Sequence, residues 1–148
     1  RQWRQDVRRY LGLPLLGVIP RDRDHVITAE GEQGEIAERF NTVATLLRSA
    51  ARELNMKTFM VSSAVPEEGK TTVAVNLAAS MAKKGARVVL VDADLRAPRI
   101  HEILNLPNRS GLSTVLESKV DPRRIIDPTG APNPLLKQNC TESNFLVT

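Results

Sequence analysis

The chain has 148 residues, of which 41% are hydrophobic and 26% are charged, and its formal net charge is +4 at pH 7. This length suits one domain with its own core, the composition excludes a disordered or collagen-like chain, and an aromatic content of 3% argues against a nucleic-acid partner held by base stacking. A single cysteine cannot form an internal disulfide, and no apolar run approaches the ~20 residues of a membrane span, so we expect a cytoplasmic protein.

Residues 1–20 form a basic leader that becomes apolar toward its end. One carboxylate, Asp6, accompanies four arginines: Arg1, Arg4, Arg8 and Arg9. Two interpretations stay open, a solvated polar segment and a juxtamembrane stretch held near anionic lipid. Prolines and a glycine punctuate residues 11–20, which predicts an extended first strand with its apolar side chains on a sheet or core edge: Leu15, Leu16, Val18 and Ile19. Residues 21–34 are predicted to form a loop.

Helices and strands are predicted to alternate after this loop. Apolar residues recur through residues 35–54 at the spacing of one helical face: Ile36, Phe40, Val43, Leu47, Ala50 and Leu54. The continuous apolar run within residues 57–62 predicts a buried strand. A second helix is predicted at residues 71–84, with Gly85 suited to a left-handed stop. Residues 87–91 have the composition of a central parallel strand that is covered on both faces.

The strand at residues 57–62, the second helix and the strand at residues 87–91 together have the length of a βαβ unit. The predicted fold class is therefore α/β, a parallel β-sheet flanked by helices. Shorter helices are predicted at residues 98–106 and 111–118. Beyond Asp121, prolines and a glycine predict loop, and a strand is predicted to begin at residues 144–148 as the chain stops.

Residues 63–72, which we call the phosphate loop, read Ser-Ala-Val-Pro-Glu-Glu-Gly-Lys-Thr-Thr and lie between a predicted strand and a predicted helix. In that context backbone N–H groups converge on one spot and the helix dipole favours an anion there. Lys70 would reach the β- and γ-phosphates of ATP, the Thr71 hydroxyl would ligate Mg²⁺, and Thr72 would contact the α-phosphate. The predicted nucleotide-binding residues are Ala64, Val65, Pro66, Glu67, Glu68, Gly69, Lys70, Thr71 and Thr72.

One position in this loop departs from the usual Gly-x4-Gly-Lys-[Ser/Thr] pattern, because Ala64 replaces the first glycine. Alanine fits if this position does not need a positive φ. The alternative interpretation of the loop is an ordinary strand-to-helix turn with a surface lysine. The flanking pattern favours the nucleotide site.

Two carboxylates, Asp92 and Asp94, follow the strand predicted at residues 87–91. Open α/β sheets bind ligands at the carboxyl ends of their strands. One carboxylate can hold Mg²⁺ or its water, and the other can accept the proton of an attacking hydroxyl. The alternative is a solvated turn in which an aspartate caps the next helix. The predicted catalytic residues are Lys70, Asp92 and Asp94, and the predicted metal ligands are Thr71, Asp92 and Asp94.

These motifs resemble those of the bacterial tyrosine kinases of capsule and exopolysaccharide synthesis. Residues 62–72 are similar to that family's Ser-Ser-x-x-Pro-x-Glu-Gly-Lys loop, and its Asp-x-Asp-x-Arg-x-Pro signature is matched by Asp92, Asp94, Arg96 and Pro98. The leader looks like the segment that joins these kinases to a membrane-anchored chain-length regulator. The resemblance implies a P-loop NTPase fold, phosphoryl transfer from ATP to protein tyrosines, and a polysaccharide co-polymerase as partner at the cytoplasmic face of the inner membrane. Residues 1–20 would be the juxtamembrane-type leader and residues 21–148 the kinase domain.

The chain also departs from this family. Where the kinases carry Glu-x2-Arg-x2-Arg, which helps assemble a ring, the chain has Glu38, Asn41 and Ala44, so charge-assisted contacts would be lost and a stable ring is not expected. A third signature ending in aspartate and a tyrosine-rich tail are missing before Thr148, and the one tyrosine is Tyr10. We therefore expect a truncated kinase domain.

Two other functions stay open. A regulatory module that binds ATP without transferring phosphate would explain the missing arginines and the missing third aspartate. A partitioning-type ATPase is the other possibility. Such ATPases usually have a lysine where this chain has Val65, which counts against that interpretation.

Overall fold

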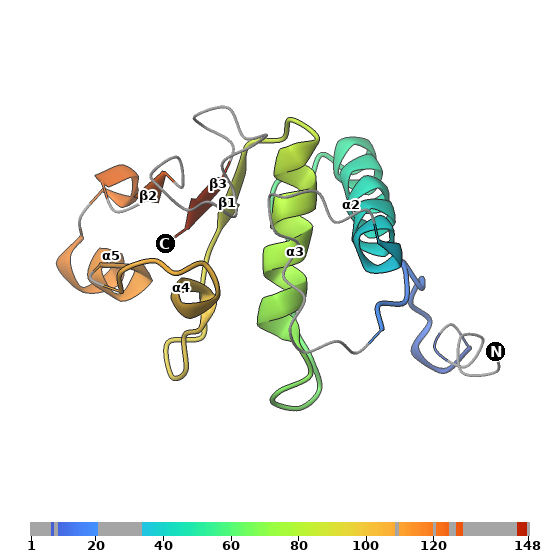
Figure 1. Ribbon diagram of the computed structural model, residues 1–148, viewed down its shortest axis with the longest axis horizontal. Helices are drawn as coiled ribbons and strands as arrows, with labels where there is room; N and C mark the ends of the chain where they lie inside the picture. Colours follow the sequence, from blue (N-terminus) through green and yellow to red (C-terminus); the bar gives the residue numbers. More distant parts are fainter. Residues whose placement is uncertain are drawn as a thin grey trace.

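The computed structural model describes residues 7, 9–20, 34–108, 110–119, 121–124, 127–128 and 145–147. Its elements in chain order are α2 (Glu35–Glu53), α3 (Lys70–Lys83), β1 (Val88–Leu90), α4 (Ile100–Ile103), α5 (Leu112–Ser118), the 3₁₀ helix η1 (Pro122–Arg124), β2 (Asp127–Pro128) and β3 (Phe145–Val147). Figure 1 shows α3 between α2 on one side and the sheet with α4 on the other. The predicted α/β class is confirmed, and the loop predicted at residues 21–34 lies outside the described residues except for Gly34.

The described sheet has three strands in the order β1-β3-β2. β1 pairs in parallel with β3, with Val88 opposite Phe145 and Leu90 opposite Val147, so the strands predicted at residues 87–91 and 144–148 are confirmed. The prediction that the first of these is central and covered on both faces is wrong. β1 lies at an edge of the described sheet, and while Leu90 is buried, Val89 on the opposite face is 50% exposed. Side chains alternate across a strand, and the described helices cover only the Leu90 face.

The loop predicted beyond Asp121 is interrupted by η1 and by β2. The short strand β2 pairs antiparallel with β3, with Asp127 opposite Val147. Proline lacks an N–H group, which excludes it from central strands but not from an edge, and β2 is an edge strand of the described sheet. The prediction of loop is therefore wrong at residues 127–128.

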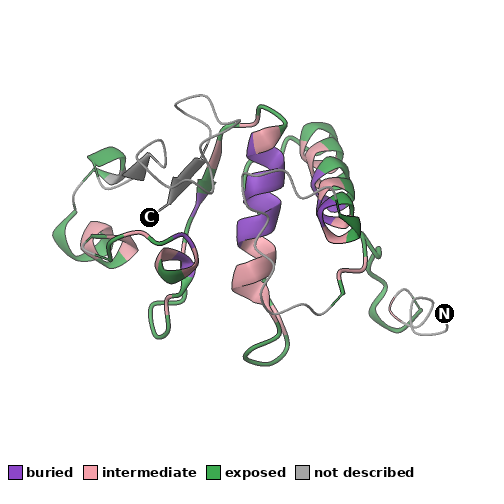
Figure 2. Ribbon diagram, in the orientation of Figure 1, coloured by how far each residue is buried: buried purple, intermediate pink, exposed green. Residues whose placement is uncertain are grey.

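Helix α3 is the centre of the core. Every residue from Val75 to Ala82 is buried, as the purple part of α3 in Figure 2 shows. One face of α3 packs on α2 in a cluster made of Ala37, Phe40, Val43, Ala44, Leu77 and Met81. Another face packs on β1 and α4 in a cluster made of Val75, Ala78, Ala82, Leu90, Ile100 and Leu104. Helix α3 is therefore held on both sides through its buried part, which begins one turn after its amino-terminal end.

Three helices end in the same way, with a left-handed residue after the last turn. After α3, Gly85 has φ +78°, its N–H donates to the Ala82 carbonyl, and the Ala86 N–H donates to the Met81 carbonyl. This pair of hydrogen bonds is the Schellman motif, which confirms the stop predicted at Gly85. Asn55 and Asn105 have φ +51° and end α2 and α4 with the same pair of bonds. Asparagine tolerates this conformation better than most residues, so both positions are sequence signals of helix ends.

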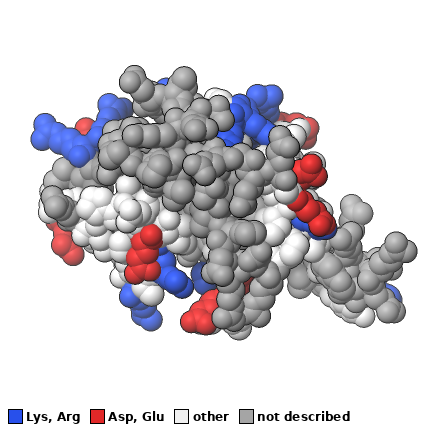
Figure 3. Space-filling view, in the orientation of Figure 1, with Lys and Arg blue, Asp and Glu red and all other residues white. Residues whose placement is uncertain are grey.

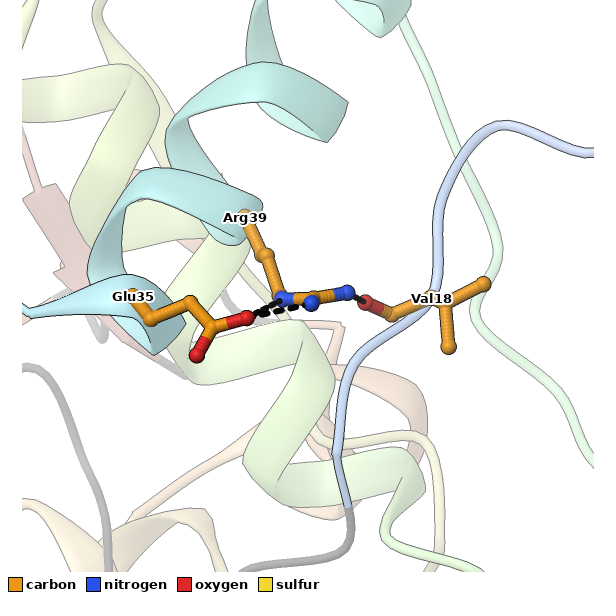
Figure 4. A network of polar contacts seen from close by, with 3 residues as sticks. All are labelled: Val18, Glu35 and Arg39. Carbon is orange, nitrogen blue, oxygen red and sulfur yellow. Dashed lines mark hydrogen bonds and ion pairs between the residues drawn. The ribbon is translucent and has the colours of Figure 1, made fainter.

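The end of the leader lies against α2 without forming a strand. The Arg39 guanidinium donates to the Val18 carbonyl at 2.9 Å and also to the Glu35 carboxylate, as Figure 4 shows. Ile19 packs against the cluster between α2 and α3. The strand predicted at residues 11–20 is wrong, because the side chain of Arg39 replaces a neighbouring strand as the hydrogen-bond partner of this segment.

Two further predictions need correction. Residues 57–62 form no strand and are not buried, since Met60 is 88% exposed and Phe59 is 40% exposed. An apolar run is buried only where other elements cover it, and no described strand pairs with this one. The helix predicted at residues 98–106 is shorter, because its first residue is Ile100 and the left-handed Asn105 ends it. The helices predicted at residues 35–54, 71–84 and 111–118 are confirmed as α2, α3 and α5.

Gly17 is expected to be required where the leader crosses α2. A Cβ atom on Gly17 would lie 2.5 Å from Cγ2 of Val43, whose branched side chain has little rotational freedom on a helix. We expect Gly17→Ala to lower the free energy of unfolding by about 1–3 kcal/mol, the usual range for overpacking, as measured by urea denaturation.

The matched control removes the clashing methyl group. In a Val43→Ala background, the additional change Gly17→Ala should cost little, because the space that its Cβ needs is then empty. An equal cost in both backgrounds would contradict the contact between Gly17 and Val43.

Candidate phosphate-binding site

The phosphate loop turns into α3 at Gly69. Gly69 has φ +88° and ψ 19°, a left-handed conformation that glycine adopts without a steric penalty, and its carbonyl accepts the Val73 N–H at 2.9 Å. Lys70 is the first residue of the helix and Thr71 the second, and both are half-buried. The Gly-Lys-Thr sequence therefore lies at the helix start, as predicted.

The first turn of α3 is suited to an anion. It contains no acidic residue, although acids stabilise an isolated helix at this end. Within the described ranges, no acceptor is found for the N–H groups of Lys70, Thr71 and Thr72. Three N–H groups and the positive end of a 14-residue helix are thus available to a ligand such as a phosphate.

The earlier part of the loop is closed by two side chains. The Glu68 Oε2 atom accepts the Ala64 N–H at 3.0 Å and the Val65 N–H at 3.3 Å. The Ser63 hydroxyl donates to the Val65 carbonyl at 2.7 Å. Sequence reasoning placed Glu68 among the residues that line the nucleotide and missed this contact. The sequence signal for this contact is spacing, because Glu68 follows Ala64, the first residue of the Ala-x4-Gly-Lys motif, by four residues.

The acidic pair lies directly after β1, and both carboxylates accept backbone N–H groups. Asp92 Oδ1 accepts the Asp94 N–H at 3.1 Å, and Asp92 Oδ2 accepts the N–H groups of Arg99 at 2.9 Å and Ile100 at 3.0 Å. Asp94 Oδ1 accepts the Ala97 N–H at 3.2 Å. Asp92 is half-buried, whereas Asp94 is exposed. By accepting N–H groups at the start of α4, Asp92 takes the capping role that the sequence offered as the alternative for this pair.

Figure 1 shows that the phosphate loop and the turn after β1 lie at the same end of the molecule, at the bottom of the view. Figure 3 shows acidic and basic side chains together along this lower edge. In the part of the chain that is described, no three His, Cys, Asp or Glu side chains form a group that could hold a metal. A magnesium ion at this end would therefore depend on few protein ligands, water and phosphate oxygens, which is its usual coordination in nucleotide sites.

The positions of the missing arginine motif lie on α2. Glu38 is exposed, but Ala44 is 0% exposed and belongs to the cluster between α2 and α3. The Asn41 carbonyl accepts the Lys84 ammonium at 3.0 Å. An arginine at position 44 would put a charge into the core as this helix is placed, so alanine here fits the packing of α2 on α3.

Among the described helices, none combines the length and the apolar character that a bilayer crossing requires.

Comparisons with known proteins agree with this geometry. The family model of ParA, described as NUBPL iron-transfer P-loop NTPase, matches residues 55–129. The tyrosine-protein kinase YwqD of Bacillus subtilis is 43% identical over 83 residues, which are 56% of this chain and 35% of that protein. The tyrosine-protein kinase wzc of Salmonella typhimurium is 32% identical over 116 residues, which are 78% of this chain and 16% of that protein.

Solved structures of bacterial tyrosine kinase domains have a similar fold. The kinase domain of the Escherichia coli tyrosine kinase ETK superposes with a TM-score of 0.73 at 26% identity, covering 94% of this chain and 55% of that domain. The chain thus spans about a third or less of the two curated relatives and little more than half of the solved kinase domain.

Proposed function

Because this chain belongs to the ParA family of P-loop NTPases and is related to bacterial tyrosine kinases, we propose that it binds ATP with Mg²⁺ and transfers the γ-phosphoryl group to protein tyrosines. The observation that carries the proposal is the start of α3, where Gly69, Lys70 and Thr71 adjoin three N–H groups available to phosphate. We further propose that it acts beside a membrane-anchored polysaccharide co-polymerase at the cytoplasmic face of the inner membrane, in capsule or exopolysaccharide assembly.

Each proposed residue has one task. The Lys70 ammonium pairs with the β- and γ-phosphates, the Thr71 hydroxyl is a magnesium ligand, and Thr72 binds the α-phosphate. Bound Mg²⁺ would neutralise charge that develops on the phosphate oxygens. Asp92, oriented by three backbone N–H groups, holds the ion or its water.

The transfer itself breaks the bond between the γ-phosphorus and its bridging oxygen and forms a bond from the tyrosine oxygen to that phosphorus. The tyrosine proton passes to a carboxylate, for which Asp94 is the exposed candidate. The phosphate loop positions the transferred group. The residues named here do not bind the tyrosine substrate, which would be held by other parts of the protein.

A second function is favoured by one observation. Asn41 and Ala44 stand where the kinases carry the two arginines of their ring motif, and Ala44 is buried, so this chain lacks both charges. A module that binds ATP and regulates a polysaccharide assembly without phosphoryl transfer agrees with this difference. A partitioning-type ATPase is the third candidate, and Val65 in place of lysine counts against it.

The test is a calorimetric titration of the chain with ATP in the presence of Mg²⁺ and again in excess EDTA. We expect binding in magnesium and a loss of about tenfold or more in affinity without it, because the ion offsets repulsion between the phosphates and the loop carboxylates. Binding that is absent under both conditions would contradict the proposal.

The same samples are then incubated with a tyrosine-containing peptide and probed for phosphotyrosine and for released phosphate. Phosphotyrosine supports the kinase. ATP binding without either product supports the regulatory module, and phosphate release without phosphotyrosine supports the ATPase.

A further inference from the structure

Glu68 has a role that the nucleotide-contacting residues do not share. Its Oε2 atom accepts two N–H groups, from Ala64 at 3.0 Å and Val65 at 3.3 Å, and so connects the middle of the phosphate loop to its beginning. Both N–H groups donate to the same carboxylate oxygen, and both contacts are exposed to solvent. The carboxylate is the only described group that joins these two parts of the loop.

The backbone between these residues supplies little support of its own. Pro66 has no N–H group to donate, and Glu67 has φ +60°, a left-handed conformation that is unfavourable for a residue with a side chain. Gly69 is left-handed as well. In the described structure the remaining hydrogen bond within the loop comes from the Ser63 hydroxyl. The loop conformation thus depends on side-chain acceptors and donors, mainly on Glu68.

The direction of the Glu68 carboxylate also matters electrostatically. A negative charge in a loop that receives a triphosphate opposes binding unless it is turned away or neutralised. One oxygen of Glu68 accepts the N–H groups of residues 64 and 65. The N–H groups of Lys70, Thr71 and Thr72 are not bonded to this carboxylate. The neighbouring carboxylate of Glu67 carries the same charge, and no described residue donates a hydrogen bond to it.

We propose that Glu68 is a positioning residue, whose carboxylate holds the first half of the phosphate loop closed so that the N–H groups at the start of α3 remain directed at the phosphates. The proposal rests on the nucleotide function proposed above. It assigns opposite effects to two adjacent glutamates, although both lose one negative charge when they are replaced.

The experiment compares Glu68→Ala with Glu67→Ala and Glu68→Gln in the full chain. Glu68→Ala should weaken Mg²⁺–ATP binding about tenfold, the order expected for one hydrogen bond to a charged group. Glu67→Ala should tighten binding about twofold, because it removes repulsion only. Glu68→Gln keeps an oxygen acceptor at the same place and should recover most of the lost affinity.

A measurement without nucleotide separates this proposal from the function on which it rests. Amide hydrogen exchange, followed by NMR, should show that Ala64 and Val65 exchange about tenfold faster in Glu68→Ala than in the unaltered chain or in Glu67→Ala. Equal exchange in Glu68→Ala and the unaltered chain would overturn the proposal, and so would equal ATP affinities of the two alanine variants. Tighter binding by Glu68→Ala than by Glu67→Ala would show that the carboxylate competes with the phosphates. An unaltered chain that does not bind ATP would refute the proposed function instead, while the exchange rates would still judge the Glu68 contact.

Discussion

Replacement of Lys70 by methionine is expected to lower the affinity for Mg²⁺–ATP by about a hundredfold without lowering the stability of the chain. Two charge-assisted contacts to phosphates, each of about 1.5 kcal/mol, account for this loss. The folded state should not suffer, because a cation at the first position of a helix is unfavourable to the helix dipole. Lys70 lies at that position. Calorimetry gives the affinity, and the thermal midpoint of the same samples gives the stability.

Lys57→Met is the matched control, because it removes an exposed ammonium with the same change of side chain outside the phosphate loop. Its ATP affinity should stay within about twofold of the unaltered chain, since exposed charges at a distance are screened by salt. Equal losses in the two variants would mean that Lys70 acts only through the net charge. A lower thermal midpoint in Lys70→Met would assign the lysine a structural role instead.

Phe40→Ala should have the largest effect on stability. Phe40 is 2% exposed and is the largest side chain in the cluster between α2 and α3. Truncating a buried phenylalanine typically costs about 3–5 kcal/mol, from lost burial and from the cavity that remains. Since small domains are stable by only about 5–15 kcal/mol, urea denaturation should show a much lower midpoint.

Leu46→Ala on the same helix is the control for this change. Leu46 is 45% exposed, and alanine is a strong helix former, so we expect a change within about 0.5 kcal/mol. A loss of comparable size in both variants would show that the cost does not come from the burial of Phe40. A small loss in Phe40→Ala alone would mean that the cluster between α2 and α3 contributes little to the folded state.

Much of this fold follows from short-range pattern. The apolar spacing in α2 and α3 is helical, and Gly85 ends α3 by a mechanism that depends only on its neighbours. The start of α3 at the Gly-Lys-Thr sequence was predicted for the same reason, because a left-handed glycine and an open helix end are local features.

The strand predictions that proved wrong depend on distant partners. Residues 57–62 contain an apolar run typical of a buried strand, yet no described element covers Met60. Val89 is apolar as well, and no described element covers its face of β1. The leader was expected to pair with a sheet, and instead a side chain of α2 binds the Val18 carbonyl. Composition indicates that a segment can be buried, but it does not identify the element that buries it.

In the candidate site, too, local features could be predicted, and contacts that depend on the path of a loop could not. The positions of Lys70 and Thr71 could be predicted from the motif. The sequence offered a capping role for the aspartate pair and a spacing for Glu68, but it did not identify which N–H groups their carboxylates accept. The carboxylates of Glu68 and Asp92 bind backbone N–H groups whose positions depend on the exact path of a loop. Motif spacing reports which residue types are present, and it does not report the acceptor of each N–H group.

The contact of the leader with α2 has a consequence for how a preceding segment would be attached. Val18 is held through its carbonyl, and at Gly17 the backbone passes so close to Val43 that no side chain fits. A segment attached ahead of these residues would therefore leave the domain from a fixed point beside α2. A free linker would instead let the domain sample a volume that grows with the length of the linker. The contact with α2 therefore limits how far the attachment point can move relative to the phosphate loop.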